Sequence, residues 1–135
     1  MTVRPVDEDP AFDARLAEAL NQFNYAAVGA FDGRGLDFAV EEGGELVAGL
    51  AGYTWAGIAE VKTLWVHEDR RGSGVGRDLM TAAIVEARAR GCARMFLSTH
   101  SFQARGFYEK LGFELIATIP DKPLGHAEHW LQLSL

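Results

Sequence analysis

The sequence predicts a mixed α/β fold with one central sheet flanked by helices. Three observations support this prediction. Runs of β-favouring residues are separated by turn signals, two segments carry apolar residues at helical spacing, and strands and helices alternate in the second half of the chain. A chain of 135 residues, 48% of them apolar and 24% charged, can bury a core of its own. We therefore expect a single domain over residues 1–135.

The first part of the chain is predicted to contain a short strand at 2–4 and a helix at 10–23. Apolar residues recur at helical spacing in the helix, at Phe12, Leu16, Ala19, Leu20 and Phe23. Pro10 suits its first turn. The glycine-rich segment 29–35 is expected to be a flexible loop.

Three consecutive strands are predicted next, at 36–42, 45–53 and 58–67. The pair Gly43-Gly44 is a strong hairpin signal between the first two, and Ala56-Gly57 marks the turn before the third. Short turns join antiparallel neighbours. We therefore expect an antiparallel meander.

From Gly76 the apolar period changes to that of a helix, with Leu79, Met80, Ala83, Ile84 and Ala87 on one face and Gly91 at its end. A strand at 93–99, a short helix at 102–111 and a strand at 113–119 follow. The last strand, 129–135, places Leu131, Leu133 and Leu135 on one face. Packing in the core is enough to explain that face, and pairing of two copies of the chain into a homodimer is the alternative.

Charge and composition exclude several classes of protein. A net charge of −6 disfavours a general binder of nucleic acid or of anionic membranes. The chain has no run of about 18 apolar residues and no secretory leader. Its one cysteine, Cys92, allows neither an internal disulfide nor a CxxC metal motif, and it is expected to be a buried structural thiol. We expect a cytoplasmic protein.

The most informative segment is 64–76, which runs from a strand through a charged turn into glycines that open a helix. Glycines let the backbone approach a ligand closely, and the free amides of a helix start attract anions. Arg70, Arg71 and Arg77 add positive charge. A dinucleotide-binding motif would need glycine at Arg77, and a P-loop would need Gly-Lys at Arg77 and Asp78. The segment therefore predicts a phosphate cradle of another kind.

The spacing Arg71-x-x-Gly74-x-Gly76 after a strand resembles the GNAT superfamily of acyl-CoA-dependent N-acyltransferases. The segment 107–113, Phe-Tyr-Glu-Lys-Leu-Gly-Phe, is similar to the second coenzyme-contacting motif of that family. The resemblance implies a GNAT fold with a mostly antiparallel sheet of about six or seven strands. It also implies acetyl-CoA as the acetyl donor.

The resemblance further implies which residues contact the coenzyme. They are Leu64, Trp65, Val66, Arg71, Gly72, Ser73, Gly74, Val75, Gly76, Arg77, Gln103, Tyr108 and Lys110. Many family members carry an asparagine at the end of the fifth strand, where this chain has 99–106. Gln103 or Ser101 is expected to supply the polar contact instead. In the family the strand that leads into the cradle is splayed from its neighbour at a bulge.

Acetyl transfer needs a neutral amine and a proton for the leaving thiolate. By resemblance, Tyr108 is the candidate acid, and the alternative is a tyrosine that only packs against the coenzyme. Glu60 matches the base of some family members, and the alternatives are a surface carboxylate with proton loss to solvent, or His100 as the base.

Acceptor recognition is expected from Asn24, Tyr25, Trp55, His100 and the loop 120–126. His126 and His129 have no evident third ligand, so no metal is expected. The leading hypothesis is an N-acetyltransferase acting on a primary amine of a small molecule or a peptide end. A non-catalytic acyl-CoA-binding module and a protein-modifying acetyltransferase are the alternatives.

Overall fold

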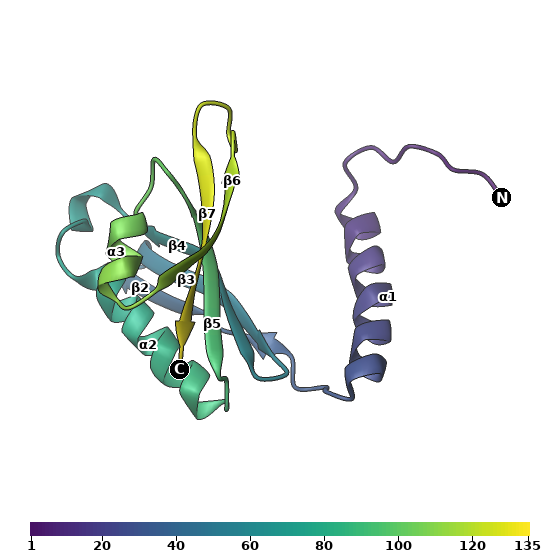
Figure 1. Ribbon diagram of the computed structural model, residues 1–135, viewed down its shortest axis with the longest axis horizontal. Helices are drawn as coiled ribbons and strands as arrows, with labels where there is room; N and C mark the ends of the chain where they lie inside the picture. Colours follow the sequence, from purple (N-terminus) through teal and green to yellow (C-terminus); the bar gives the residue numbers. More distant parts are fainter. The chain divides into compact units, whose positions relative to one another are not determined.

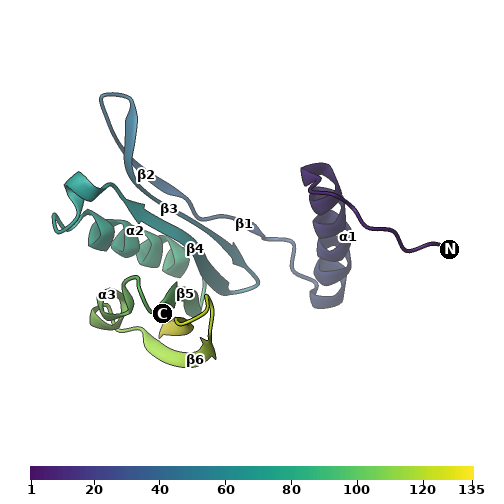
Figure 2. The ribbon, with the colours of Figure 1, turned by 90° about the horizontal axis from the view of Figure 1, so that it is seen from above.

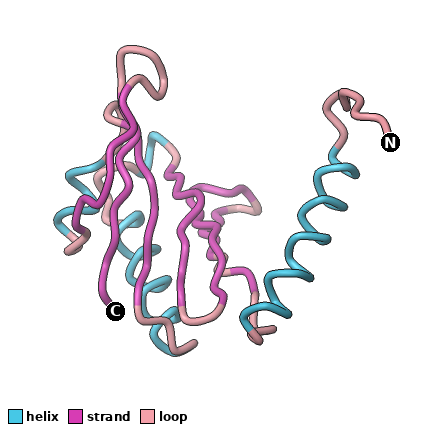
Figure 3. The backbone as a smooth tube through the Cα atoms, turned by 45° about the vertical axis from the view of Figure 1, so that its right-hand side comes forward, coloured by secondary structure: helices cyan, strands magenta, loops and turns pink.

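A computed structural model describes residues 1–135, which form two compact units, residues 1–31 and residues 32–135. The first unit contains one helix, α1 (Pro10–Val28), drawn as an uninterrupted helix in Figure 3. The side chain of Asp9 accepts a hydrogen bond from the Ala11 amide at 3.0 Å and caps its start. Gly29 ends it with a φ of 73° and donates to the Tyr25 carbonyl at 2.8 Å.

Two expectations for this unit are wrong. The helix extends five residues beyond 23, because no glycine or proline interrupts the chain before Gly29. Asn24 and Tyr25 therefore lie within α1 rather than after it. Residues 2–4 form no strand, since no other strand pairs with them.

The second unit is built on a seven-stranded sheet, which confirms the predicted mixed fold. Its strands are β1 (Arg34–Gly35), β2 (Phe38–Glu42), β3 (Glu45–Trp55), β4 (Ile58–Val66), β5 (Arg94–His100), β6 (Glu114–Pro120) and β7 (Ala127–Ser134). The order is β1-β3-β4-β5-β7-β6, with β2 beside β3. Only β4 and β5 pair in parallel, and all other pairs are antiparallel.

The predicted meander is present as β2, β3 and β4. Gly43 and Gly44 both have positive φ in the first turn, and Ala56 and Gly57 have positive φ in the second. The loop expected at 29–35 contains the short strand β1, because Arg34 and Gly35 pair with the end of β3.

Two helices of this unit, α2 (Val75–Ala89) and α3 (Arg105–Lys110), lie on the same side of the sheet (Figures 1 and 2). A short 3₁₀ helix, η1 (Glu68–Arg70), precedes α2. The helix α3 is shorter than the predicted 102–111, because residues 101–104 form a turn after β5. The core contains Leu50, Val61, Leu79, Met80, Met95, Leu97, Tyr108, Phe113 and Leu131.

The last strand, β7, lies between β5 and β6, and Leu131 is fully buried in the core. Cys92 is a buried free thiol, and burial raises its pKa. No helix of the structure is long and apolar enough to cross a membrane.

Candidate active site

A cleft of about 850 Å³ opens where β4 and β5 separate. The two strands pair only from Ile58 with Arg94 to Val61 with Leu97, although β4 continues to Val66 and β5 to His100. Beyond the last pair, the edge of β4 that faces β5 keeps its backbone N–H and C=O groups free of a neighbouring strand. An extended ligand can form hydrogen bonds with such an edge.

A bulge in β4 lies beside this separation. The register of β3 against β4 shifts between Ala51 and Gly52, which leaves Lys62 without a partner residue on β3. A β-carbon on Gly52 would lie 2.3 Å from the carbonyl oxygen of Glu60, so only glycine fits there. The bulge that the family resemblance implied is therefore present.

The start of α2 closes one end of the cleft. Gly72 and Gly74 have φ of 77° and 91°, a conformation that favours glycine. No side chain caps α2, so the amides of its first turn, from Val75 to Arg77, are available to a ligand. A β-carbon on Gly76 would make ordinary van der Waals contacts with Val66 and Phe107, at 3.5 Å and 3.6 Å, so this turn of α2 lies close to β4 and α3 at the cleft.

Four cationic side chains line the cleft: Lys62, Arg70, Arg71 and Arg77. Arg70 forms hydrogen bonds and an ion pair with Glu42, which raise the pKa of Arg70 and lower that of Glu42. Nε of Arg71 donates to the Val66 carbonyl at 3.2 Å. These contacts fix the turn before α2, and the cleft can attract an anion although the chain as a whole is acidic.

Tyr108 of α3 lines the same cleft and is 8% exposed. Its ring packs edge-on against Phe107 and Phe113, with centroids 5.1 Å and 5.9 Å away. The chain gives its hydroxyl no hydrogen-bond partner, and no fully buried side-chain oxygen lacks one, so the hydroxyl keeps access to solvent. Burial raises the pKa of Tyr108, which keeps the hydroxyl protonated at neutral pH.

Gln103 reaches the cleft from the turn after β5. Its Oε1 accepts a hydrogen bond from the His100 amide at 2.7 Å and lies 3.1 Å from His100 Nδ1. The side chain of Ser101 accepts instead from the Ala127 amide at 3.0 Å. Of the two predicted substitutes for the family's asparagine, Gln103 is the one that lines the cleft.

The structure brings together most of the predicted coenzyme contacts. Those that line the cleft are Leu64, Trp65, Val66, Arg71, Gly72, Gly74, Val75, Gly76, Arg77, Gln103 and Tyr108. Ser73 and Lys110 are not among the lining residues, and the Ser73 hydroxyl donates to the Arg70 carbonyl within the turn.

The predicted base and acceptor contacts do not line the cleft. Glu60 is half-buried and pairs in register with Phe96, one residue before the strands separate. Trp55 lies at the far end of β3, and His100 ends β5. Asn24 and Tyr25 belong to the first unit.

Sequence reasoning missed several residues that line the cleft, among them Lys62, Thr63, Ser98, Thr99 and Phe102. These residues come together only because β4 and β5 diverge, and no local sequence pattern predicts that divergence. Gly52 could have indicated the bulge, since an isolated glycine in a predicted strand often lies at a bulge.

The histidines considered as metal ligands have other partners. His126 meets the ring of Phe102, and Nδ1 of His129 lies 2.9 Å from the Thr118 hydroxyl. The structure has no cluster of three or more metal-ligating side chains.

Comparisons with known proteins agree with this geometry. Residues 4–113 match the Acetyltransferase (GNAT) family. The chain is 43% identical over 97 residues to a blasticidin-S acetyltransferase of Streptomyces morookaense, covering 70% of each chain. It is 30% identical over 125 residues to an acetyltransferase of Agrobacterium fabrum, covering 92% of this chain and 91% of the relative. A crystal structure of an Agrobacterium tumefaciens protein assigned as an acetyltransferase superposes with a TM-score of 0.91 at 29% identity, covering 100% and 99%.

Proposed function

The chain belongs to the GNAT acetyltransferase family, and we propose that it transfers the acetyl group of acetyl-CoA directly to a primary amine of a small molecule or a peptide end. The observation that carries this proposal is the cleft between the diverging ends of β4 and β5, closed by the uncapped start of α2. Such a cleft combines an edge for an extended amide chain with a cradle for phosphates.

The residues present fit acetyl-CoA as the donor substrate. The amides from Val75 to Arg77 and the guanidinium of Arg77 are assigned to its pyrophosphate, since they lie at the uncapped start of α2 in the cleft lining. The free edge of β4 from Leu64 to Val66 is placed to pair with the amides of its pantetheine arm. An amide of this edge is also the candidate donor to the charged oxygen that develops during transfer.

Two side chains are assigned to proton transfer, one as the acid and one as the base. The Tyr108 hydroxyl, protonated and open to the cleft, donates a proton to the departing thiolate. Glu60 accepts the proton of the amine through water, since an unperturbed alkylamine is only about one part in 10³ neutral at pH 7. The half-buried position of Glu60 beside the strand separation supports this assignment.

A small-molecule acceptor is supported by the relative named for blasticidin S. The test is a panel of primary amines, with blasticidin S among them and peptides with free amino ends beside it. Release of free thiol from acetyl-CoA and the mass of the product are measured. We expect amine-dependent thiol release with a gain of one acetyl group. Binding of acetyl-CoA with no release for any amine would contradict the proposal and favour a non-catalytic acyl-CoA-binding module.

A further inference from the structure

A buried carboxylate lies on the sheet face opposite α2 and α3. Glu128 of β7 pairs in register with His100 of β5 and is only 6% exposed. Leu97 and Leu131, which pair with each other, face the core. Side chains alternate along a strand, so Glu128, His100 and Trp130 lie on the other face.

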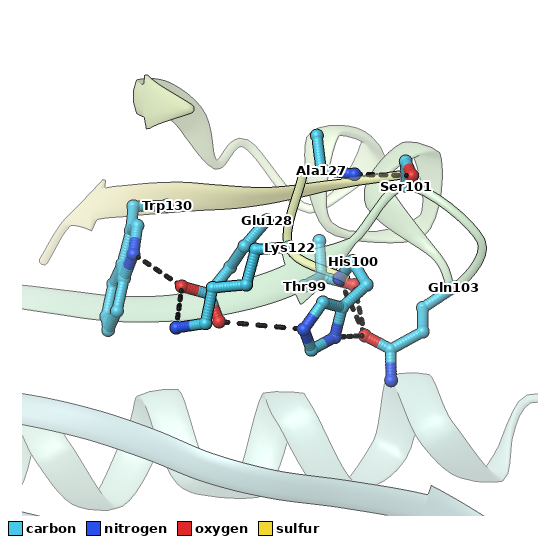
Figure 4. Close-up of polar contacts among 8 residues, drawn as sticks. All are labelled: Thr99, His100, Ser101, Gln103, Lys122, Ala127, Glu128 and Trp130. Atoms are coloured by element: carbon cyan, nitrogen blue, oxygen red, sulfur yellow. Dashed lines mark hydrogen bonds and ion pairs between the residues drawn. The ribbon is translucent and has the colours of Figure 1, made fainter. Parts of the chain in front are cut away.

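Figure 4 shows these side chains in one row that ends at Gln103. One oxygen of the carboxylate, Oε1, accepts hydrogen bonds from Lys122 Nζ at 3.0 Å and from Trp130 Nε1 at 3.1 Å. The other oxygen, Oε2, lies 3.7 Å from His100 Nε2, which is too long for a hydrogen bond. No fully buried side-chain oxygen lacks a partner, so Oε2 keeps access to solvent. It can therefore accept a hydrogen bond from a ligand.

Aromatic rings stand on both sides of this carboxylate. Trp130 lies 6.1 Å from Phe96 between ring centroids. His100 stacks on Phe102 at 5.2 Å, and Phe102 meets His126 at 5.0 Å. A carboxylate among aromatic rings attracts an organic cation by charge and by cation–π contact.

The row of side chains leads from Glu128 to the cleft. Phe102 is 57% exposed and, together with Gln103, lines the cleft, while the ring of His100 lies between Gln103 and Glu128. Glu128 itself does not line the cleft, so a molecule that reacts there would have to extend past His100 to reach it.

The ammonium group of Lys122 already pairs with the Glu128 carboxylate, so it competes with any ligand cation for that carboxylate. Lys122 comes from the turn between β6 and β7, and its side chain is 53% exposed while that of Glu128 is 8% exposed. The Lys122 ammonium is in contact with water, so it can exchange its hydrogen bond to the nearly buried carboxylate for hydrogen bonds to water. Lys122 thus neutralises part of the charge of Glu128 at Oε1, while Oε2 stays accessible to a ligand.

We propose that Glu128 determines acceptor specificity by binding, through Oε2, a guanidinium or ammonium group of the acceptor other than the amine that is acetylated. The reacting amine must lose a proton, and a carboxylate beside it would favour its charged form. The cation at Glu128 is therefore a second group of the same molecule. This inference rests on the proposed function and narrows the acceptor to amines that carry a further positive charge.

The first test needs no turnover. The indole N–H resonance of Trp130, assigned with a Trp130→Phe variant, is followed by NMR while methylguanidinium or its neutral isostere N-methylurea is added. We expect a saturable shift with methylguanidinium, at least about tenfold weaker binding in Glu128→Gln, and no comparable shift with the urea. Glu114→Gln, at an exposed position of β6, is the matched control and should bind as the wild type does.

Lys122→Met provides a second test, which stays informative even if the Glu128→Gln variant does not fold. Because it removes the competing ammonium and keeps the carboxylate, we expect it to bind methylguanidinium more tightly than the wild type. Equal shifts from the cation and the urea, or binding unaltered in both variants, would overturn the proposal.

The second test uses turnover of agmatine and of N-(4-aminobutyl)urea, which differ only in the charge of the distant group. We expect Glu128→Gln to reduce the preference for agmatine in kcat/KM by about tenfold while the KM for acetyl-CoA stays unchanged. An unchanged preference would overturn the proposal. If no amine is acetylated but the NMR titration behaves as expected, the proposed function fails and the cation site stands.

Discussion

Val61 of β4 and Leu97 of β5 form the last pair of residues between the two parallel strands. Both side chains are buried in the core, at 5% and 1% exposure, so the strands are fixed at this point. One residue further along β4, the bulge at Lys62 turns the strand away from β5. Packing in the core thus keeps the two strands together at one end of the cleft, and the bulge separates them at the other end.

Gly74→Val should weaken acetyl-CoA binding. Gly74 has a φ of 91°, and a β-branched residue there costs about 1–3 kcal/mol or forces the start of α2 to change conformation. We expect at least about a tenfold increase in the Kd measured by calorimetry.

Gly91→Val is the matched control for this change. Gly91 follows the other end of α2 with a φ of 80°, and a β-carbon there would also meet nothing within 4 Å. We expect a similar loss of thermal stability but wild-type affinity for acetyl-CoA. Equal affinities of the two folded variants would remove the cradle assignment.

Tyr108→Phe should lower kcat by about 10² to 10⁴ and leave the KM for acetyl-CoA almost unchanged. The substitution removes the hydroxyl and keeps the ring that packs between Phe107 and Phe113. Since burial places the pKa of Tyr108 above its ordinary value, any loss of rate between about pH 6 and 9 must come from another group. A variant with wild-type turnover would make Tyr108 a packing residue only.

Glu60→Gln should reduce kcat/KM, and raising the pH should partly restore it. The reason is that a larger fraction of the free amine is neutral at higher pH, so less help is needed to remove its proton. The measurement is a pH profile of kcat/KM with one good acceptor.

His100→Gln separates the two candidate bases. If Glu60 is the base, this variant should act mainly on the KM of the acceptor, because His100 lies between Gln103 and Glu128 outside the cleft lining. Loss of the acidic limb of the profile in His100→Gln, beside an unaltered profile in Glu60→Gln, would assign the base to His100 instead.

Glu128 should make folding stability depend on acid pH. The hydrogen bond from Lys122 is the main reason that the pKa of Glu128 lies below its ordinary value. The charged carboxylate therefore stabilises the folded protein above about pH 4.3, and this contribution is lost as the pH falls through the lower folded-state pKa.

The measurement is urea unfolding of the wild type and of Glu128→Gln between about pH 6 and pH 3. We expect the wild type to lose more stability than the variant over this range, and Glu114→Gln to follow the wild type. Parallel loss of stability in all three proteins would show that Glu128 does not contribute.

The elements that follow from local pattern were predicted well. The hairpin at Gly43-Gly44 and the start of α2 need only neighbouring residues, and both are present. Boundaries that depend on contacts were less accurate. The expected strand at 129–135 begins instead at Ala127, because β5 and β6 both pair with that residue's neighbour Glu128. Glu128 therefore lies outside both the predicted loop 120–126 and the predicted strand, and no role was predicted for it.

The sequence by itself determined the glycine-rich turn and the uncapped start of α2, because both depend only on residues from Arg70 to Arg77 that are neighbours in the chain. Only the tertiary structure decided the cleft and the row that leads from Gln103 to Glu128. The cleft requires two strands to part at a core-fixed pair, and the row requires side chains from β5, β7 and the turn between β6 and β7 to meet on one face. Contacts of this kind arise from packing between distant segments, which leaves no periodic trace in the chain.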